Sequence, residues 1–280
     1  MKHIIIPTDF SENAYAAMQY AVQFFANEEC MFYLLHAFTP AAYNVASIGE
    51  SYSMLQLQDI TKKNAEVKFT QIVKTLQEKF PNDKHQFECI TAFNLLVMEI
   101  LDLIDSKNIG FIVMGTKGAT GAKEVFIGTH TTHVLKKVSV PVIAVPSGYT
   151  FEPVRDIVFA TDLKFSKKNP NLTIIKDLCH IHDAELHVLN AHDAPMTNEQ
   201  EDRLLFINDF FRNTPHLFHL DEDGDVMEAI EAYKQKSNSN LLVMIHNRHT
   251  FFENLLFRPV INQVAYHTDV PFLVLPSKED

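Results

Sequence analysis

Three glycines and a threonine in the first half of the chain have the spacing of a loop that could hold phosphate groups. Gly115, Gly118, Gly128 and Thr129 form the pattern Gly-x2-Gly-x9-Gly-Thr, between an apolar run and a helical pattern. Glycine permits positive φ and lets backbone N–H groups approach a polyphosphate, while Thr129 adds a hydroxyl where a helix dipole favours an anion. Ligands of open α/β folds bind at the carboxyl edge of the sheet, where this loop would lie. The spacing therefore predicts an anion site.

A second interpretation of the same loop stays open on spacing alone, because glycine-rich turns after strands need no ligand. Two better-known phosphate motifs are missing. Residues 121–124 lack the Gly-Lys-Ser/Thr of a Walker A loop, and no Gly-x-Gly-x-x-Gly follows the first strand. Lys117 and Lys123 can offset phosphate charge, although loop lysines are more often simply solvated.

Short apolar runs alternate with helical periodicity, which is typical of βαβ units in a doubly wound parallel sheet. In the first half we expect strands over residues 2–7, 31–37, 85–91, 110–115 and 141–145. The expected helices cover residues 12–26, 54–79, 95–106 and 129–137. Asp9 or Ser11 is expected to cap the first helix and Asn94 the third, and residues 38–53 should form a surface loop.

The second half repeats this plan. Residues 4–9 recur as 157–162, and residues 33–37 recur as 187–191. Two later segments recur at one constant offset: 111–114 as 241–244, and 139–147 as 269–277. Four matches in order indicate an internal repeat. We therefore expect an α/β fold with two tandem Rossmann-like domains, residues 1–148 and 152–280, each a five-stranded, mostly parallel sheet flanked by helices.

The second copy has lost the glycine pattern. The gap-free alignment places Ile245 at the position of Gly115, Arg248 at Gly118, Arg258 at Gly128 and Pro259 at Thr129. Side chains now fill places where backbone must approach a ligand, and proline removes an N–H donor. Asp162 survives, but a lone acidic residue cannot recruit a nucleotide. A structural role is favoured, although Arg248, Arg258, His246 and His249 could form a different anion site.

Composition excludes several classes of partner. The net charge is −11 and no run of Lys and Arg occurs, which argues against nucleic acid. No stretch approaches the roughly 18 apolar residues of a membrane span, and residues 1–9 do not form a secretory signal. The three cysteines suggest neither a disulfide framework nor a zinc site. We expect a cytoplasmic protein without membrane contact.

Neither a metal site nor a catalytic constellation is expected. Histidine and cysteine spacings that could bind a metal occur at residues 130–133, 179–182 and 246–249, but nothing completes a closed site. No nucleophile elbow, Ser-His-Asp arrangement or kinase signature is present. The predicted set of catalytic residues is therefore empty.

At these residues the sequence resembles the universal stress protein family, over essentially the whole chain twice. The markers are residues 7–11, His36-Ala37, the glycine pattern, and residues 140–146. The resemblance implies the adenine nucleotide alpha hydrolase-like type of Rossmann fold. It also implies that an adenosine pocket would be lined by Pro7, Thr8, Asp9, Ala37 and Met114. The phosphates would be held by Gly115, Gly118, Gly128, Thr129 and His130. His130 departs from the small or apolar residue common in the family, so it could contact a phosphate or crowd it.

The resemblance implies a regulatory binding protein of the stress response. ATP or a related adenine nucleotide, alone or with Mg²⁺, would occupy the first copy, one per chain, and change which protein partner is bound. Slow hydrolysis is the most catalysis expected. A ligand-free interaction module is the alternative, in which residues 141–145 and 271–274 pair as in family dimers to form a pseudo-dimer within one chain. Further homodimerisation stays open, and a nucleotide-dependent transferase or a flavoprotein of related fold has little support.

Overall fold

The computed structural model describes residues 1–39, 48–116, 128–191, 195–221, 229–230, 232–233, 237, 239–246 and 269–277. Part of the predicted phosphate loop, including Lys117, Gly118 and Lys123, lies outside the described residues, as do Arg248, His249, Arg258 and Pro259 of the second copy. Within these ranges, none of the helices combines the length and apolar character that crossing a membrane requires.

Strands and helices alternate through both halves. The first half contains β1 (Lys2–Pro7), α1 (Glu12–Phe24), β2 (Cys30–Ala37), α2 (Ile48–Lys79), β3 (His85–Ala92), α3 (Leu96–Lys107), β4 (Phe111–Gly115), α4 (Thr129–Lys137) and β5 (Val142–Val145). The second contains β6 (Asp156–Ala160), α5 (Leu172–His182), β7 (Glu185–Ala191), α6 (Asn198–Phe210), β8 (His216–Asp221), β9 (Leu241–His246) and β10 (Phe272–Pro276).

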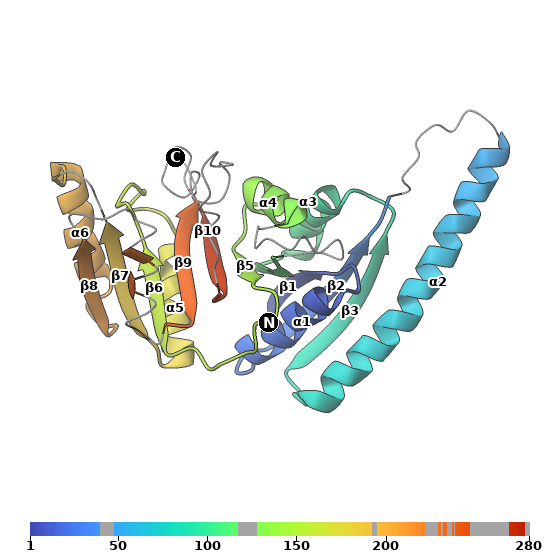
Figure 1. The fold of residues 1–280 in the computed structure, drawn as a ribbon, viewed down its shortest axis with the longest axis horizontal. Helices are drawn as coiled ribbons and strands as arrows, with labels where there is room; N and C mark the ends of the chain where they lie inside the picture. Colours follow the sequence, from blue (N-terminus) through green and yellow to red (C-terminus); the bar gives the residue numbers. More distant parts are fainter. Residues whose placement is uncertain are drawn as a thin grey trace.

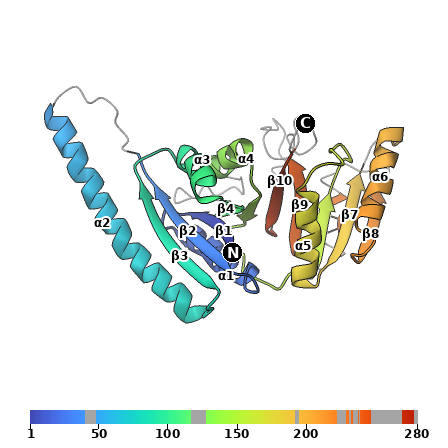
Figure 2. The same cartoon turned by 180° about the vertical axis from the view of Figure 1, so that it is seen from behind.

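All ten strands belong to one sheet with the order β3-β2-β1-β4-β5-β10-β9-β6-β7-β8. Each half contributes five strands in the same relative order, and the antiparallel pair at the centre relates the halves by an approximate twofold rotation (Figures 1 and 2). Neighbours within each half are parallel, and β5 pairs with β10 in the antiparallel sense. The two Rossmann-like five-stranded units are confirmed, and so is the expected pairing of the final strands; the domain boundaries stay a prediction.

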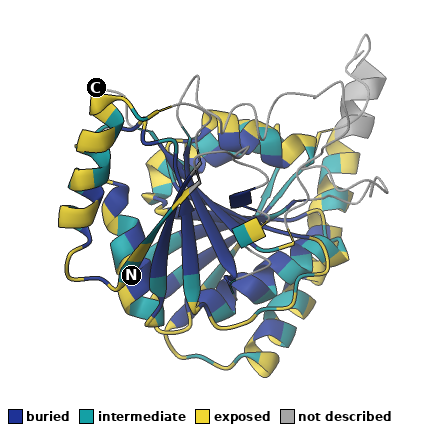
Figure 3. Cartoon of the chain, turned by 60° about the vertical axis from the view of Figure 1, so that its left-hand side comes forward, coloured by how far each residue is buried: buried dark blue, intermediate teal, exposed yellow. Residues whose placement is uncertain are grey.

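Helices cover both faces of this sheet. On one face α1, α2, α5 and α6 bury a core cluster that includes Ile4, Phe32 and Phe159. On the other face α3 and α4 pack over a second cluster that includes Ile5 and Ile112. The strands are dark blue along their centres in Figure 3, because β-strands covered on both sides bury successive side chains alternately in the two clusters.

Three local predictions meet different outcomes. Ser11 caps α1, since its side chain accepts a hydrogen bond from the amide of Ala14. The prediction for Asn94 is wrong: Leu95 occupies the N-cap position of α3, and Asn94 instead accepts from the amide of Leu95. The predicted loop over residues 38–53 is also wrong in its last part, because α2 begins at Ile48. The polar pattern of β3 follows from its place at the edge of the sheet.

The two halves share buried side chains across their junction. Ile143 of β5 and Leu273 of β10 are register partners and belong to one core cluster that runs through both halves. Phe24, near the end of α1, lies with its ring centroid 4.6 Å from that of His182 at the end of α5. The halves therefore form one continuous hydrophobic core.

The buried position of His182 gives the junction a pH dependence. Burial lowers the pKa of His182 from 6.5 to about 4, and its Nε2 has no hydrogen-bond partner among the described residues. As pH falls from about 6.5 to 4, the unfolded chain takes up a proton that the folded chain excludes, so stability falls over that window. Between pH 7 and pH 5, exclusion of this proton should lower the free energy of unfolding by about 1 to 2 kcal/mol, a figure that takes the partial exposure of His182 into account.

We expect the His182→Phe variant to lack this contribution, since phenylalanine packs against Phe24 without titrating. Urea unfolding at pH 7 and pH 5 measures the difference. Wild type should lose about 1 to 2 kcal/mol more than the variant on going to pH 5. Equal losses in the two proteins would show that the ring of His182 is not excluded from water.

Candidate functional site

The candidate site lies at the carboxyl edge of the first half, where the order of the strands reverses. The chain passes from β1 to β2 on one side, then returns to place β4 on the other side of β1. Such a reversal separates the loops that follow the two central strands and leaves a ligand-binding crevice in open α/β sheets. The ends of β1, β2 and β4 meet at this edge, as the alternation of strands and helices predicts.

Two side-chain turns fix the backbone that leaves β1. Thr8 is buried; its amide donates to the carbonyl of Leu35 over 2.8 Å, and its Oγ1 accepts from the amide of Phe10. Asp9 is exposed, and its Oδ1 accepts from the amide of Ser11 over 3.0 Å. Phe10 has a φ of 64°, a left-handed conformation that bulky residues rarely adopt. These hydrogen bonds fix the position of the Asp9 carboxylate at the carboxyl edge of the sheet.

His36 ties β2 to this turn. Its Nδ1 lies 2.9 Å from the carbonyl oxygen of Thr8, and its ring packs against that of Phe10 with centroids 4.5 Å apart. The Phe10 ring packs in turn against Phe69 of α2. Stacking of this kind explains how the strained conformation of Phe10 is maintained. Neither the left-handed residue nor the His36 bond was predicted, since single-residue backbone conformations leave little trace in a sequence.

Gly115, the last residue of β4, is a glycine because α1 passes very close to it. A Cβ atom at this position would lie 2.5 Å from Nδ2 of Asn13 and 3.2 Å from the Asn13 carbonyl oxygen. These separations are shorter than van der Waals contact. The glycine pattern predicts that Gly115 serves ligand approach, whereas the structure shows that packing against α1 also requires glycine here.

The start of α4 is tied to the end of β4. Gly128 donates its amide to the carbonyl of Thr116 over 2.5 Å, and the Thr131 hydroxyl donates to the carbonyl of Gly115 over 2.9 Å. Gly128 is the N-cap residue; no side chain of the described residues caps the helix, and its first turn contains no acidic residue. Thr129 and His130 are exposed there. The positive end of the helix dipole therefore lies at the carboxyl edge, where it favours an anion.

The structure brings most of the predicted site residues to this one edge. The described members are Pro7, Thr8, Asp9, Ala37, Met114, Gly115, Gly128, Thr129 and His130. The Met114 side chain is buried in the core cluster beneath α3 and α4, so any contribution to a ligand pocket comes from its main chain. Gly118 lies outside the described residues.

The second half keeps the β1 turn but not the glycine. Thr161 Oγ1 accepts from the amide of Leu163, which has a φ of 59°, and Asp162 Oδ1 accepts from the amide of Lys164. These contacts repeat those of Thr8, Phe10 and Asp9. Ile245, however, stands at the position of Gly115 and is buried at the end of β9. The Ile245 side chain belongs to the core cluster that α1, α2, α5 and α6 bury, together with Leu163 of the retained turn.

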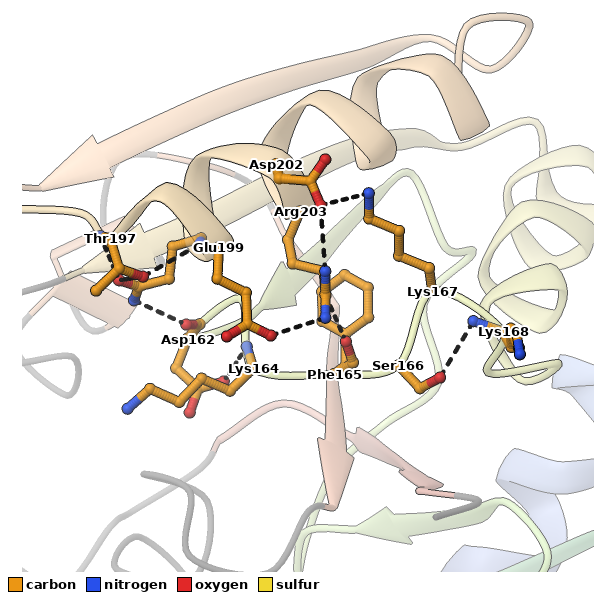
Figure 4. Close-up of polar contacts among 11 residues, drawn as sticks. Asp162, Lys164, Phe165, Ser166, Lys167, Lys168, Thr197, Glu199, Asp202 and Arg203 are labelled. Carbon is orange, nitrogen blue, oxygen red and sulfur yellow. Dashed lines mark hydrogen bonds and ion pairs between the residues drawn. The ribbon is translucent and has the colours of Figure 1, made fainter. Parts of the chain in front are cut away.

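A cavity of about 730 Å³ lies in the second half, between the turn after β6 and the start of α6. Two of its basic side chains have acidic partners (Figure 4): Lys167 lies 2.5 Å from Asp202, and Arg203 Nη2 lies 2.9 Å from Glu199. Arg203 also donates from Nε to the carbonyl of Phe165 over 2.8 Å. Ion pairing offsets the charge of these two cations.

Comparisons with known proteins agree with the architecture. The model of the universal stress protein family matches residues 1–146. A universal stress protein of Methanocaldococcus jannaschii is 24% identical over 152 residues, which cover 51% of this chain and 94% of that protein. The crystal structure of a universal stress protein from Archaeoglobus fulgidus covers 98% of both chains at 18% identity, with a TM-score of 0.70. The cytoplasmic domain of a prokaryotic cation chloride cotransporter covers 100% of this chain and 97% of its own, at 11% identity and a TM-score of 0.56. The two structural likenesses show a shared fold.

Proposed function

Because the chain belongs to the universal stress protein family, we propose that its first half binds one ATP or related adenine nucleotide and acts as a regulatory protein. The observation that carries the proposal is the start of α4, which no described side chain caps, at the same carboxyl edge of the sheet as the Asp9 carboxylate. Occupancy would change which protein partner is bound, since a ligand shifts a protein toward the conformation that it binds best.

The two ends of a nucleotide need different groups, and this edge offers both. The exposed Asp9 carboxylate can accept hydrogen bonds from the hydroxyl or amino groups of an adenosine. The start of α4 offers amide donors and a positive helix end to phosphates, with the hydroxyl of Thr129 beside them. Hydrogen bonds to a charged phosphate are worth about 1.5 to 3 kcal/mol each. The residues present therefore fit an adenine nucleotide.

One nucleotide per chain is expected, because the two halves differ at the positions where the protein backbone would contact the nucleotide. Asp162 repeats the geometry of Asp9, but Ile245 replaces Gly115. A residue with a Cβ at that position lacks the conformational freedom and close backbone approach that glycine permits.

Calorimetric titration of the full chain with ATP, with and without Mg²⁺, tests the proposal. Wild type should bind one equivalent. Thr129→Pro should raise Kd about tenfold or more, because it removes an N–H donor and a hydroxyl. Proline is tolerated at the first position of a helix, so the melting temperature should change little. Absence of binding in wild type that has been freed of co-purified nucleotide would overturn the proposal.

Asp9→Asn and Asp162→Asn provide a matched pair, because the two carboxylates accept equivalent backbone bonds. We expect weaker binding from the first and unchanged affinity and stoichiometry from the second. Equal effects would place the nucleotide elsewhere.

The β5–β10 pairing favours a second candidate, a ligand-free interaction module in which the halves form a pseudo-dimer. The Gly118→Arg variant, which copies Arg248, separates the two. If the variant loses both nucleotide binding and binding of its protein partner, the result supports the regulatory proposal. If the variant binds no nucleotide but still binds its protein partner as wild type does, the result supports the ligand-free interaction module.

A further inference from the structure

We propose that Asp156, Glu185 and His187 form a binding site for one Zn²⁺ ion at the amino edge of the second half of the sheet. Asp156 begins β6 and Glu185 begins β7, and the two are register partners in the parallel pair. His187 lies two residues beyond Glu185, so its side chain points to the same face of the sheet. Two carboxylates and an imidazole thus converge from neighbouring strands.

The donor atoms have the spacing of metal ligands. His187 Nε2 lies 3.6 Å from Asp156 Oδ1 and 3.7 Å from Glu185 Oε2. All three donor atoms lie within 4.8 Å of one another. Zinc binds nitrogen and oxygen at about 2.0 to 2.2 Å, which places tetrahedral ligands roughly 3.4 Å apart. Small rotations of the two carboxylates are enough to close around an ion.

The surroundings of His187 orient it as a ligand. Its other ring nitrogen, Nδ1, lies 3.2 Å from Nε2 of His219 on β8. With the proton on Nδ1 donated to His219, the Nε2 lone pair faces the carboxylates, as zinc requires. The Tyr233 ring packs against both histidines, with centroids 5.5 Å from His187 and 4.4 Å from His219. The imidazole is therefore held in place before any ion arrives.

Burial differs among the three ligands in a way that suits ion entry. The His187 side chain is 8% exposed, whereas those of Asp156 and Glu185 are 26% and 43% exposed. The imidazole is the most buried ligand of the site, and the two carboxylates are accessible to solvent. Three protein ligands leave a coordination position for solvent, as in other three-ligand zinc sites.

Two carboxylates that converge on one imidazole favour a cation at the same place. A protonated His187 in two ion pairs is the competing explanation, and a divalent ion supplies more positive charge at the same place. The first half is an internal control, because the aligned residues are His3, Met31 and Tyr33, and His3 Nδ1 bonds with the Tyr33 hydroxyl. One zinc ion per chain is expected.

The three ligands share no local motif, so the sequence alone predicts no metal site here. Asp156 is distant in sequence from Glu185 and His187, and only the β6–β7 register brings them together. The histidine and cysteine spacings at residues 130–133, 179–182 and 246–249 involve other residues.

Titration of the metal-free full chain with zinc chloride, followed by native mass spectrometry and thermal melting, tests this site. We expect one tightly bound zinc ion and a higher melting temperature in its presence. Asp156→Asn, Glu185→Gln and His187→Gln should each weaken binding at least tenfold, because each removes a ligand. Glu88→Gln is the matched control: it removes a strand carboxylate of the first half that pairs with Lys107, and should leave zinc binding unchanged.

Melting without zinc shows whether each variant is folded, and a variant that does not fold is replaced by one at another of the three positions. The proposal is overturned if wild type binds no zinc, or if folded ligand variants bind it as well as wild type. In the first case, NMR signals of a doubly protonated His187 ring at neutral pH would identify ion pairing as the sole role of the cluster.

Discussion

Replacing Gly115 with alanine is expected to destabilise the protein by about 1 to 3 kcal/mol and to abolish or severely weaken nucleotide binding. The added Cβ would lie 2.5 Å from Asn13 Nδ2 and 3.2 Å from the Asn13 carbonyl oxygen. A flexible amide can move away, but the carbonyl belongs to the first turn of α1, which must shift as a unit. Overpacking of this kind typically costs about 1 to 3 kcal/mol. Urea unfolding and ATP titration of the same sample measure both effects.

A double-mutant cycle with Asn13→Ser isolates the contact. Serine is smaller than asparagine and lacks the amide group that the new Cβ would meet. We expect the double variant to recover about half of the lost stability, because the backbone contact at 3.2 Å remains. Strict additivity of the two single changes would show that Asn13 does not determine the need for glycine.

Leu273→Ala is expected to lower the free energy of unfolding by about 3 kcal/mol and to destabilise both halves together. Leu273 is fully buried opposite Ile143 at the junction, within the core cluster that runs through both halves. Large-to-small changes at such positions cost about 2 to 5 kcal/mol. Urea unfolding followed by circular dichroism gives the free energy, and calorimetry shows whether a single transition persists.

Leu217→Ala is the control for this prediction. Leu217 lies on the edge strand β8 and is 48% exposed, so its truncation should cost at most about 0.5 kcal/mol. Two separate transitions in wild type, or a Leu273 effect confined to one of them, would contradict a continuous core.

Most of the fold could be predicted because its signals are local and repeated. Apolar runs marked the strands, and the recurrence of residues 139–147 as 269–277 indicated that the two final strands are equivalent. The antiparallel β5–β10 pairing then followed from the resemblance to family dimers. The start of α2 was missed because residues 48–53 carry no clear helical period. Asn94 was predicted to be the N-cap of α3 from its residue type alone. The helix begins one residue later than predicted, so Leu95 occupies the N-cap position.

The candidate site was predictable only in part. The family resemblance identified Asp9 and the glycine–threonine pattern identified Thr129, and the structure places both at one edge of the sheet. The left-handed Phe10 and the approach of Asn13 to Gly115 depend on backbone geometry and helix packing. Such features arise from tertiary contacts, and a single sequence carries no direct record of them.

The antiparallel β5–β10 junction joins two halves of one chain, where two separate chains would form a symmetric dimer. In such a dimer the pairing weakens on dilution and every substitution occurs twice. Here the linker holds both strands together at any protein concentration, and each substitution occurs once. Ile245 could therefore replace a glycine in one half while Gly115 was kept in the other. Covalent linkage thus allows one half to serve as scaffold while the other keeps the residues of the proposed nucleotide site.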